Sequence, residues 1–423
     1  MKASDVVVIG GGISGMLAAI AAAKKGKSVT MLRYGYGAFE IGGGLIDIMA
    51  YPNDKKSSSS LKNCIGSLSS DHPYSKLGLQ RVEDAVKFLL DLTKEEGYAY
   101  EGGVEELHWV PTAVGTMKPT GLYPKSFDVE VLKKADTIYL VDFKGLKDYY
   151  AKLTEKTLKK LLGEDKKYEI VTVDPKMEEA IGGRDIMIMD IARWLDKSEG
   201  QEDCASQLKA FVKPGAAVVF PQVLGTMPSY AAYDKMKSAL QCDVTEALCI
   251  PPSAAGMRLS KLLHNAARKY GVKIIEKARV KSAVVKGGVC EAVIASGVGR
   301  EHTYAGKSFI LATGGYYSGG LEVLDNNKVL EPIFNLPVKV MSQKEDEWAN
   351  LEMFSDKKQP FALAGVTVNY EMCPVNENGE KVLKNVFVTG RNLCGYDFCF
   401  EKSGNGVALA SAYQAAASAM EVK

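Results

Sequence analysis

The sequence predicts an α/β protein in which a Rossmann-like domain is interrupted by an inserted α/β domain. An apolar run at residues 6–9 leads through glycines into a helix of small residues at about 14–25 and a second strand at 28–32, which is a βαβ opening. The chain, at 423 residues, is about twice as long as a usual single domain. The stretch NDKKSSSS at 53–60 is polar and aperiodic, which is typical of a linker.

Residues after this linker-like stretch predict a second α/β body. We expect a helix near 83–93, a strand at 137–142, and strands at 169–173 and 217–220. A helix starting at Leu146 is expected to carry Tyr149, Tyr150 and Leu153 on one face.

The pattern changes again at Pro251. A helix is predicted up to Gly271, with Leu259, Leu262 and Leu263 on its apolar side. Short strands follow and end in the apolar run SFILATGG, and a last strand, NVFVTG, precedes a glycine-rich turn and an Ala-rich helix. The predicted division is a Rossmann-like domain in three parts at 1–52, 251–325 and 385–423, an inserted α/β substrate or partner domain at 53–250, and a cap segment at 326–384.

Composition and charge narrow the class of protein. The chain has 46% hydrophobic and 25% charged residues, which argues against disorder, and 53 basic against 51 acidic residues leave a net charge of +2. This balance predicts no nucleic-acid partner and no attraction to an anionic membrane. The sequence runs straight into a strand, and no apolar stretch reaches the roughly 18–20 residues that span a bilayer, so a cytoplasmic location is expected.

Eight cysteines without a Cys-X-X-Cys pair and four histidines at unrelated spacings predict no metal or iron–sulfur site. Cys394 and Cys399, in CGYDFC, come nearest to a pair. We predict that they are packing residues, with a redox or metal role as the alternative.

Gly10, Gly12 and Gly15 form a Gly-X-Gly-X-X-Gly motif between the first strand and helix. The first glycine permits a tight turn, the second lets a pyrophosphate approach the backbone, and the third lets the helix pack on the strand. The helix N-terminus, which begins near Ser14, offers N–H groups to the anion. The motif therefore predicts a nucleotide or flavin phosphate site.

The acid that usually binds ribose at the end of the second strand is missing, because Leu32, Arg33 and Tyr34 stand there. An arginine suits a phosphate better than a bare ribose diol. The ligand is therefore expected to be FMN, an unusually held FAD or NADP, unless Arg33 is merely a solvated strand end.

Three further glycine-rich segments belong beside the first. Gly42, Gly43 and Gly44 bring backbone without side chains close to where a flat ring would lie. Thr313, Gly314 and Gly315 end a buried strand in backbone without bulk. Gly404, Asn405, Gly406 and Val407 begin a helix whose N-terminus would stabilise negative charge on a reduced flavin. Each is by itself compatible with a simple turn. Together they are typical of a flavoprotein, so the Rossmann-like domain is predicted to bind flavin.

Five separated segments of the sequence resemble a known family. VVVIGGGISG, AFEIGGGLIDIM, CIPPSAAGMRLSKLL, FILATGGYYSGGLEVLDNNKVLEPIFNL and GYDFCFEKSGNGVALASAYQAA are similar to the B subunit of anaerobic glycerol-3-phosphate dehydrogenase, which is related to fumarate reductase flavoproteins. The resemblance runs through almost the whole chain. It matches the phosphate turn at Gly10, Gly12 and Gly15, the ring-facing segment, the second flavin strand and the final helix start. The sequence departs from its relatives in two places: it has IGGG where they carry serines, and SGNG where they are richer in glycine.

The resemblance implies a flavin subunit that pairs with an FAD-containing A subunit and an iron–sulfur C subunit at the inner face of the membrane. Such a complex oxidises sn-glycerol 3-phosphate to dihydroxyacetone phosphate and passes electrons to a quinone. The resemblance also implies FMN in this subunit, in line with Arg33, with FAD as the alternative.

Catalytic residues are less readable from the sequence. Oxidation of a phosphorylated secondary alcohol needs a general base and a positively charged group that holds the phosphate. The main candidates are His264, Arg258 and Glu401, and further candidates are His72, Asp397 and Arg391. All of these residues also suit packing or capping roles. Two alternatives stay open: a free-standing fumarate-reductase-like enzyme acting on a dicarboxylate, with paired Arg and His at the ring edge, and a non-catalytic flavin electron relay.

Overall fold

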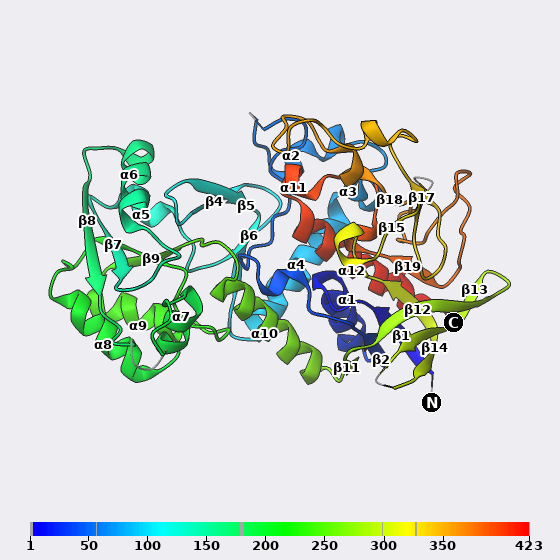
Figure 1. The fold of residues 1–423 in the computed structure, drawn as a ribbon, viewed down its shortest axis with the longest axis horizontal. Helices are drawn as coiled ribbons and strands as arrows, with labels where there is room; N and C mark the ends of the chain where they lie inside the picture. The colour runs from blue at the N-terminus through cyan, green and yellow to red at the C-terminus, as the bar shows by residue number, and fades with distance from the viewer. Residues whose placement is uncertain (1–2, 56, 178–181, 298, 326–327, 423) are drawn as a thin grey trace.

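Two α/β bodies, each built on its own sheet, make up the chain (Figure 1). The computed structural model describes residues 3–55, 57–177, 182–297, 299–325 and 328–422. Residue 56 of the linker-like stretch and the predicted start of the cap segment at 326 lie outside the described residues.

The larger sheet has the parallel order β11-β2-β1-β14-β19. Its strands come from three separate parts of the chain: β1 Ser4–Ile9, β2 Val29–Leu32, β11 Lys273–Ile275, β14 Glu301–Leu311 and β19 Val386–Val388. The first half of β14 pairs antiparallel with β13 Val289–Ser296, which pairs with β12 Arg279–Lys286. The sheet thus joins strands that lie far apart along the chain.

Two helices of small residues pack on each other and on this sheet. α1 Ile13–Lys24 is buried from Ile13 to Ala23, and the Ala-rich α12 Gly404–Glu421 contacts it along with β14 and β19. A helix that is apolar on all sides belongs in a protein interior. Short side chains let the two helices approach closely, so both N-termini are positioned by the core. α10 Ala254–Lys269 packs on α1 through its predicted apolar side, which includes Leu259, Leu262 and Leu263.

The smaller sheet is all parallel, in the order β10-β9-β7-β8. Its strands are β7 Thr137–Phe143, β8 Lys167–Val173, β9 Ala217–Pro221 and β10 Asp243–Ala247, accompanied by α6 Ala151–Leu162, α7 Ile188–Leu195, α8 Ser198–Lys209 and α9 Ala231–Leu240. The body is the left-hand one in Figure 1 and has a separate hydrophobic core.

The hydrophobic cores do not follow the division predicted at residue 53. α2 Leu61–Cys64, α3 Pro73–Leu77 and α4 Leu79–Glu95 bury their apolar side chains in the core of the larger sheet. α4 packs along α12, with the rings of Phe88 and Tyr413 5.1 Å apart. The apolar face of α4 packs against the last helix of the chain, and no local sequence pattern reveals this contact.

Residues 328–384 form short strands and turns over the larger sheet. β16 Val329–Leu330, β17 Val338–Lys339 and β18 Gly365–Val366 are joined by irregular segments. Ile333, Leu336, Val366 and Met372 belong to the larger core. Residues 328–384 therefore pack on the larger body.

The helix expected from Leu146 begins later, and its expected face is wrong. α6 starts at Ala151, because Tyr150 is its N-cap with an extended backbone. Tyr149 is buried, whereas the side chains of Tyr150 and Leu153 are exposed. Helical spacing does not apply to residues that precede the helix.

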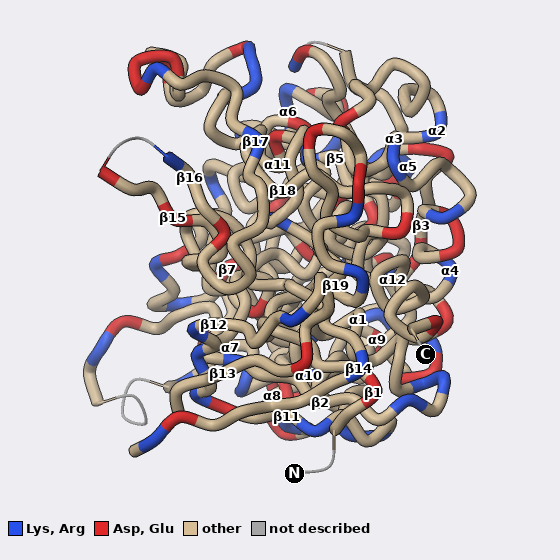
Figure 2. The backbone as a smooth tube through the Cα atoms, turned by 90° about the vertical axis from the view of Figure 1, so that its right-hand side faces the viewer, with Lys and Arg blue, Asp and Glu red and all other residues tan. Residues whose placement is uncertain are grey.

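Charged residues of both signs are intermixed over the side of the molecule shown in Figure 2, in keeping with the net charge of +2. Within the part of the chain that the structure describes, no helix combines the length and apolarity needed to cross a membrane.

Candidate flavin site

The three glycines of the first turn differ in what surrounds them. Gly10 has φ +117°, and a Cβ on it would lie 2.2 Å from the carbonyl oxygen of Ala312, while one on Gly15 would lie 2.0 Å from the oxygen of Gly10. A Cβ on Gly12 would meet nothing within 4 Å. Gly12 is the N-cap of α1, whose first turn carries neither a side-chain cap nor an acidic residue. The N–H groups of this turn are therefore open to an anion.

Residues 313–315 lie directly beside this turn, because β1 and β14 are parallel neighbours in which Ile9 pairs with Leu311. The backbone N–H of Gly314 donates to Asn392 Oδ1 at 2.9 Å, and Asn392 Nδ2 donates to Thr313 Oγ1 at 3.1 Å. The structure thus joins the first and third glycine-rich segments at one edge of the sheet.

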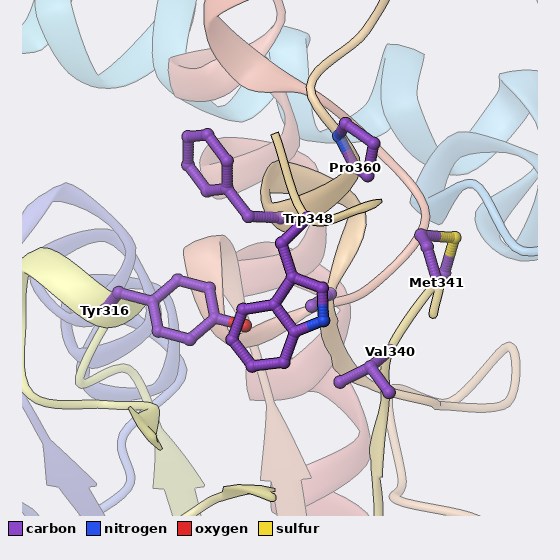
Figure 3. Close-up of a pocket in the computed structure, with 7 residues that line it drawn as sticks. Tyr316, Val340, Met341, Trp348 and Pro360 are labelled. Carbon is purple, nitrogen blue, oxygen red and sulfur yellow. The ribbon is translucent and has the colours of Figure 1, made fainter. Parts of the chain in front are cut away.

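Ser14 and Gly315 lie at the margins of this edge. A Cβ on Gly390 would lie 2.2 Å from the hydroxyl of Ser14, so α1 and the segment after β19 are in close contact. Near Gly315, Tyr316 and Trp348 line a cavity of about 10 Å³, too small for more than a water molecule (Figure 3).

The segment Gly42–Gly44 is in tight contact with protein. A Cβ on Gly43 would lie 2.6 Å from a methyl of Leu248, and one on Gly44, whose φ is +71°, would lie 2.6 Å from the oxygen of Ala255. Gly42 accommodates a Cβ at ordinary contact distances. The start of α10 and the end of the smaller sheet therefore account for two of these glycines.

The start of α12 is tied to the residues that follow this segment. Gly406 N–H donates to the oxygen of Asp47 at 2.9 Å, and Asn405 Nδ2 donates to the oxygen of Leu45 at 2.9 Å. A Cβ on Gly406 would lie 2.4 Å from the hydroxyl of Tyr74. The second and fourth glycine-rich segments, including Gly404 and Val407 on the same helix turn, thus lie side by side.

Arg33 is occupied by protein groups. Its Nε and Nη2 donate to the two carboxylate oxygens of Glu276, each at 2.7 Å, and its Nη1 donates to His264 Nε2 at 2.6 Å. His264 Nδ1 donates to the oxygen of Ser260 at 2.8 Å, so Nδ1 carries the proton. The Glu40 carboxyl group interacts electrostatically with Arg33, His264 and Glu276, and its burial raises its pKa. Arg33 is buried, and His264 is committed to orienting it.

Arg258 joins the two bodies. It is fully buried on α10 and makes a bidentate pair with Glu246 of β10, at 2.7 and 2.8 Å. Its Nε donates to the oxygen of Gly225 at 2.8 Å, and Nη1 donates to the hydroxyl of Tyr98 at 3.2 Å. The guanidinium is satisfied within the chain.

Glu401 is fully buried at the end of α11 Phe398–Glu401. It accepts hydrogen bonds from His72 Nε2 at 3.1 Å, Lys358 Nζ at 2.6 Å and Ser403 Oγ at 2.8 Å. Burial alone would raise the pKa of Glu401, but the hydrogen bond from His72 and the charge of Lys358 outweigh it and hold the pKa below its ordinary value. The network ties residues 328–384 to the turn before α12.

The remaining candidates have local roles. Asp397 caps α11 by accepting from the N–H groups of Cys399 and Phe400, each at 3.1 Å. Arg391 is exposed and lies 4.0 Å above the ring of Phe398. The structure therefore distributes the sequence candidates His264, Arg258 and Glu401 over three separate contacts, and does not assemble them into one site.

All eight cysteines are free thiols. Cys394 is buried, as predicted for a packing residue, and burial raises its pKa. Cys399 is exposed, so the packing role predicted for it is wrong: it lies on the single turn α11, where its side chain reaches solvent. Among the described residues, no His, Cys, Asp and Glu side chains gather in a group able to hold a metal ion.

Sequence reasoning missed Glu246, Glu276 and Lys358, which partner the candidates. Glu246 had a readable signal, since a charge inside an apolar strand usually has a buried partner. Glu276 and Lys358 had none, because their partners lie far away along the chain.

The fold and the phosphate turn define a class of protein, the flavoproteins with a Rossmann-like domain. The sequence model of the FAD binding domain family matches residues 5–407, and the chain belongs to this family of flavin oxidoreductases. The predicted fold class is confirmed. Within that class the chain belongs more narrowly to the family of B subunits of anaerobic glycerol-3-phosphate dehydrogenase, as its resemblance indicated.

The similarity to that family runs over nearly full length. A relative from Halobacterium salinarum, named as a probable B subunit of anaerobic glycerol-3-phosphate dehydrogenase, is 30% identical over 427 residues, covering 99% of this chain and 98% of the relative. Relatives named as the B subunit of this dehydrogenase are 29% identical in Vibrio vulnificus, over 99% and 97% of the two chains, and 27% identical in Vibrio cholerae, over 97% and 95%.

Solved structures overlap more distantly. A 3-ketosteroid delta1-dehydrogenase from Sterolibacterium denitrificans has a TM-score of 0.48 at 10% identity, covering 100% of both chains. An open conformation of a flavocytochrome c3 fumarate reductase has a TM-score of 0.38 at 12% identity, covering 99% of this chain and 78% of the other.

Proposed function

We propose that this chain is the flavin-carrying B subunit of a quinone-linked anaerobic glycerol-3-phosphate dehydrogenase. The complex oxidises sn-glycerol 3-phosphate to dihydroxyacetone phosphate and delivers the electrons to a quinone. The observation that carries the proposal is the family membership over nearly the whole chain, together with a phosphate turn that is open at Gly12.

The cofactor we propose is FAD, in place of the FMN that Arg33 suggested. The matching family is one of FAD binding domains, and Arg33 is held by Glu276 and His264, so it is not free to bind a phosphate. The turn at Gly10, Gly12 and Gly15 would hold the pyrophosphate. A flavin supplies acceptance of two electrons from an alcohol and their release one at a time.

The segments at 313–315, 42–44 and 404–407 would surround the rest of the cofactor. In this proposal residues 1–52, 251–325 and 385–423, together with the helices α2 to α4 that pack in their core, form the flavin-binding domain, and the smaller body contacts substrate or partners. The contact between residues 45–47 and the start of α12 supports one continuous site.

A second candidate function is an electron relay within the same complex. The observation that favours it is that Arg258 and Glu401 are fully buried and satisfied by protein groups, and that the basic nitrogen of His264 accepts from Arg33. In this case substrate would be oxidised on the partner A subunit, and this chain would pass electrons to the iron–sulfur C subunit.

One experiment separates these functions. The purified chain, loaded with flavin under anaerobic conditions, is mixed with sn-glycerol 3-phosphate, and the flavin absorbance near 450 nm is followed. Glycerol, which lacks the phosphate, is the matched control. Bleaching by the phosphate ester alone supports oxidation on this chain, and bleaching only after the A subunit is added supports the relay.

The proposal fails if the restored complex shows no bleaching with glycerol 3-phosphate. Reoxidation of the bleached flavin by fumarate in the isolated chain would favour the dicarboxylate enzyme instead. We also propose that the chain is cytoplasmic and reaches the inner membrane through a partner subunit. Co-sedimentation with membranes only in the presence of that subunit tests this.

A further inference from the structure

The end of β2 is the place where a dinucleotide site needs a carboxylate, and this chain has Arg33 there. The position is close to the phosphate turn, because a Cβ on Gly11 would lie 2.7 Å from the Cβ of Arg33. A ribose diol donates hydrogen bonds, and a guanidinium has no acceptor to offer it. Arg33 by itself therefore cannot replace the missing acid.

Glu276 brings a carboxylate to the same place from a different strand. It follows β11, which pairs with β2 in a parallel register that sets Ile275 opposite Leu32. Arg33 N–H donates to the oxygen of Ile275 at 3.0 Å, and Ala278 N–H donates to the oxygen of Arg33 at 2.9 Å. Residues 33 and 276 are thus level at the carboxyl ends of neighbouring strands.

The carboxylate of Glu276 is both fixed and available. Arg33 donates one hydrogen bond to each of its oxygens, and Arg33 itself is fixed by His264. A carboxylate has about four lone-pair positions, so each oxygen keeps one for another donor. The Glu276 side chain is 55% exposed, whereas that of Arg33 is 4% exposed. Solvent, or a ligand in its place, reaches the acid and not the arginine.

Exposed aromatic side chains lie on the segment that follows β2, next to the arginine that holds this carboxylate. The Arg33 guanidinium lies 4.5 Å from the ring centroid of Tyr36, and Tyr36 and Tyr34 are 71% and 68% exposed. Exposed rings near the arginine that pairs with a half-exposed acid suit a flat base joined to a diol. These residues share the sheet edge that carries the open Gly12 turn.

We infer that Glu276 is the ribose-binding acid of this protein, supplied by β11 in place of β2, and that it accepts hydrogen bonds from the ribose hydroxyls of the adenosine half of FAD. Arg33 is a positioning residue that holds Glu276 at the strand end, and not a phosphate ligand. The inference rests on the proposed FAD cofactor, and it assigns the adenosine half of the site to residues that the phosphate motif does not contain.

The test uses equilibrium binding of FAD, ADP-ribose and FMN to the flavin-free full chain. Glu276→Gln removes one ionic acceptor while keeping the shape of the side chain, and Glu291→Gln, an exposed acid on β13, is the matched control. We expect Glu276→Gln to raise the Kd for FAD and ADP-ribose about ten- to a hundredfold, as for loss of hydrogen bonds to a charged group, and to leave the Kd for FMN unchanged. The control should bind all three ligands like the wild type.

Variants of Arg33 test its positioning role. Arg33→Met should weaken FAD and ADP-ribose but not FMN, and in the double variant with Glu276→Gln the two losses should not add, because both act on one carboxylate. Equal weakening of FMN and FAD by Arg33→Met would make Arg33 a phosphate ligand and overturn the inference. Circular dichroism of each variant verifies folding, and Glu276→Asp, which keeps the charge but shortens the side chain, should also weaken FAD.

Failure of the inference is distinguishable from failure of the proposed cofactor. Wild-type chain that binds FAD tightly, with Glu276→Gln equal to it, overturns the role of Glu276 and leaves the FAD proposal intact. Wild-type chain that binds FMN but neither FAD nor ADP-ribose overturns both.

Discussion

Replacement of Arg258 by methionine should destabilise the protein without acting on its chemistry. Arg258 is fully buried and gives Glu246 two hydrogen bonds at 2.7 and 2.8 Å. In Arg258→Met the Glu246 carboxylate, which has no exposed surface, keeps only the donors Ser126 Oγ at 2.8 Å and Leu224 N–H at 2.9 Å. Breaking such a buried pair costs about 3–5 kcal/mol, because an uncompensated charge stays buried.

Urea unfolding followed by tryptophan fluorescence measures this loss. Trp109 and Trp194 pack against the core of the smaller body, so the signal reports the side of the pair that carries Glu246. Arg193→Met is the matched control: its side chain is 61% exposed and its distance to Asp190 is 3.9 Å, so we expect a change within about 0.5 kcal/mol.

The double variant Arg258→Met with Glu246→Gln should recover part of the loss, since no charge is then left stranded. A loss below about 1 kcal/mol in Arg258→Met, or strictly additive effects in the double variant, would refute the reasoning. A large fall in turnover with flavin content and stability unchanged would instead return Arg258 to the catalytic candidates.

Three further predictions follow from the same structure. Gly12→Ala should fold normally but weaken flavin binding by about tenfold or more, because its Cβ enters the open space of the turn. Gly10→Ala should instead cost at least about 2 kcal/mol of stability, since this position combines φ +117° with a 2.2 Å contact. Flavin titration and thermal unfolding of both variants check this. The hydrogen bonds from Lys24, Tyr270 and Lys269 lower the pKa of Glu95 to about 2, so its stabilising contribution is complete above the unfolded-state pKa of about 4.5 and is lost as the pH falls through the folded value. Glu95→Gln should therefore cost at most about 1 kcal/mol at pH 7, a small value because the pairs are partly solvated, and nothing near pH 2; a constant difference between the two pH values would contradict this. Of the eight cysteines, Cys399 is exposed and the other seven are buried, so a thiol reagent should modify one thiol rapidly in the native chain and none in Cys399→Ser.

Much of the fold was readable from local patterns. The βαβ opening, the helix ended by Gly271 and the parallel strands at 137–142 and 217–220 are encoded by periodicity and by glycine positions, which act over a few residues. The face expected for α6 failed because a helix start was placed too early, and side-chain spacing has no meaning before the first turn.

Only part of the candidate site could be predicted from the sequence. The sharp turn at residues 10–15 could be predicted because its glycines are close in sequence and each has a separate steric task, whereas its phosphate ligand remains a proposal. The partners of Arg33, Arg258 and Glu401 could not, because a charged side chain shows its type in the sequence but not its neighbour. Arg33 was expected to face a phosphate, and in the fold it faces an acid 243 residues away.

The sequence by itself therefore determined the class of fold, the family and the open turn at Gly12, since these depend on residue types at short, regular spacings. Tertiary structure alone decided that β11 lies beside β2 and sets Glu276 against Arg33, that Glu246 neutralises Arg258 between the two bodies, and that Lys358 reaches Glu401. Strand order and helix packing are fixed by burial of apolar surface, which is non-directional and carries no local signature, and the polar contacts then form where that burial leaves charges together.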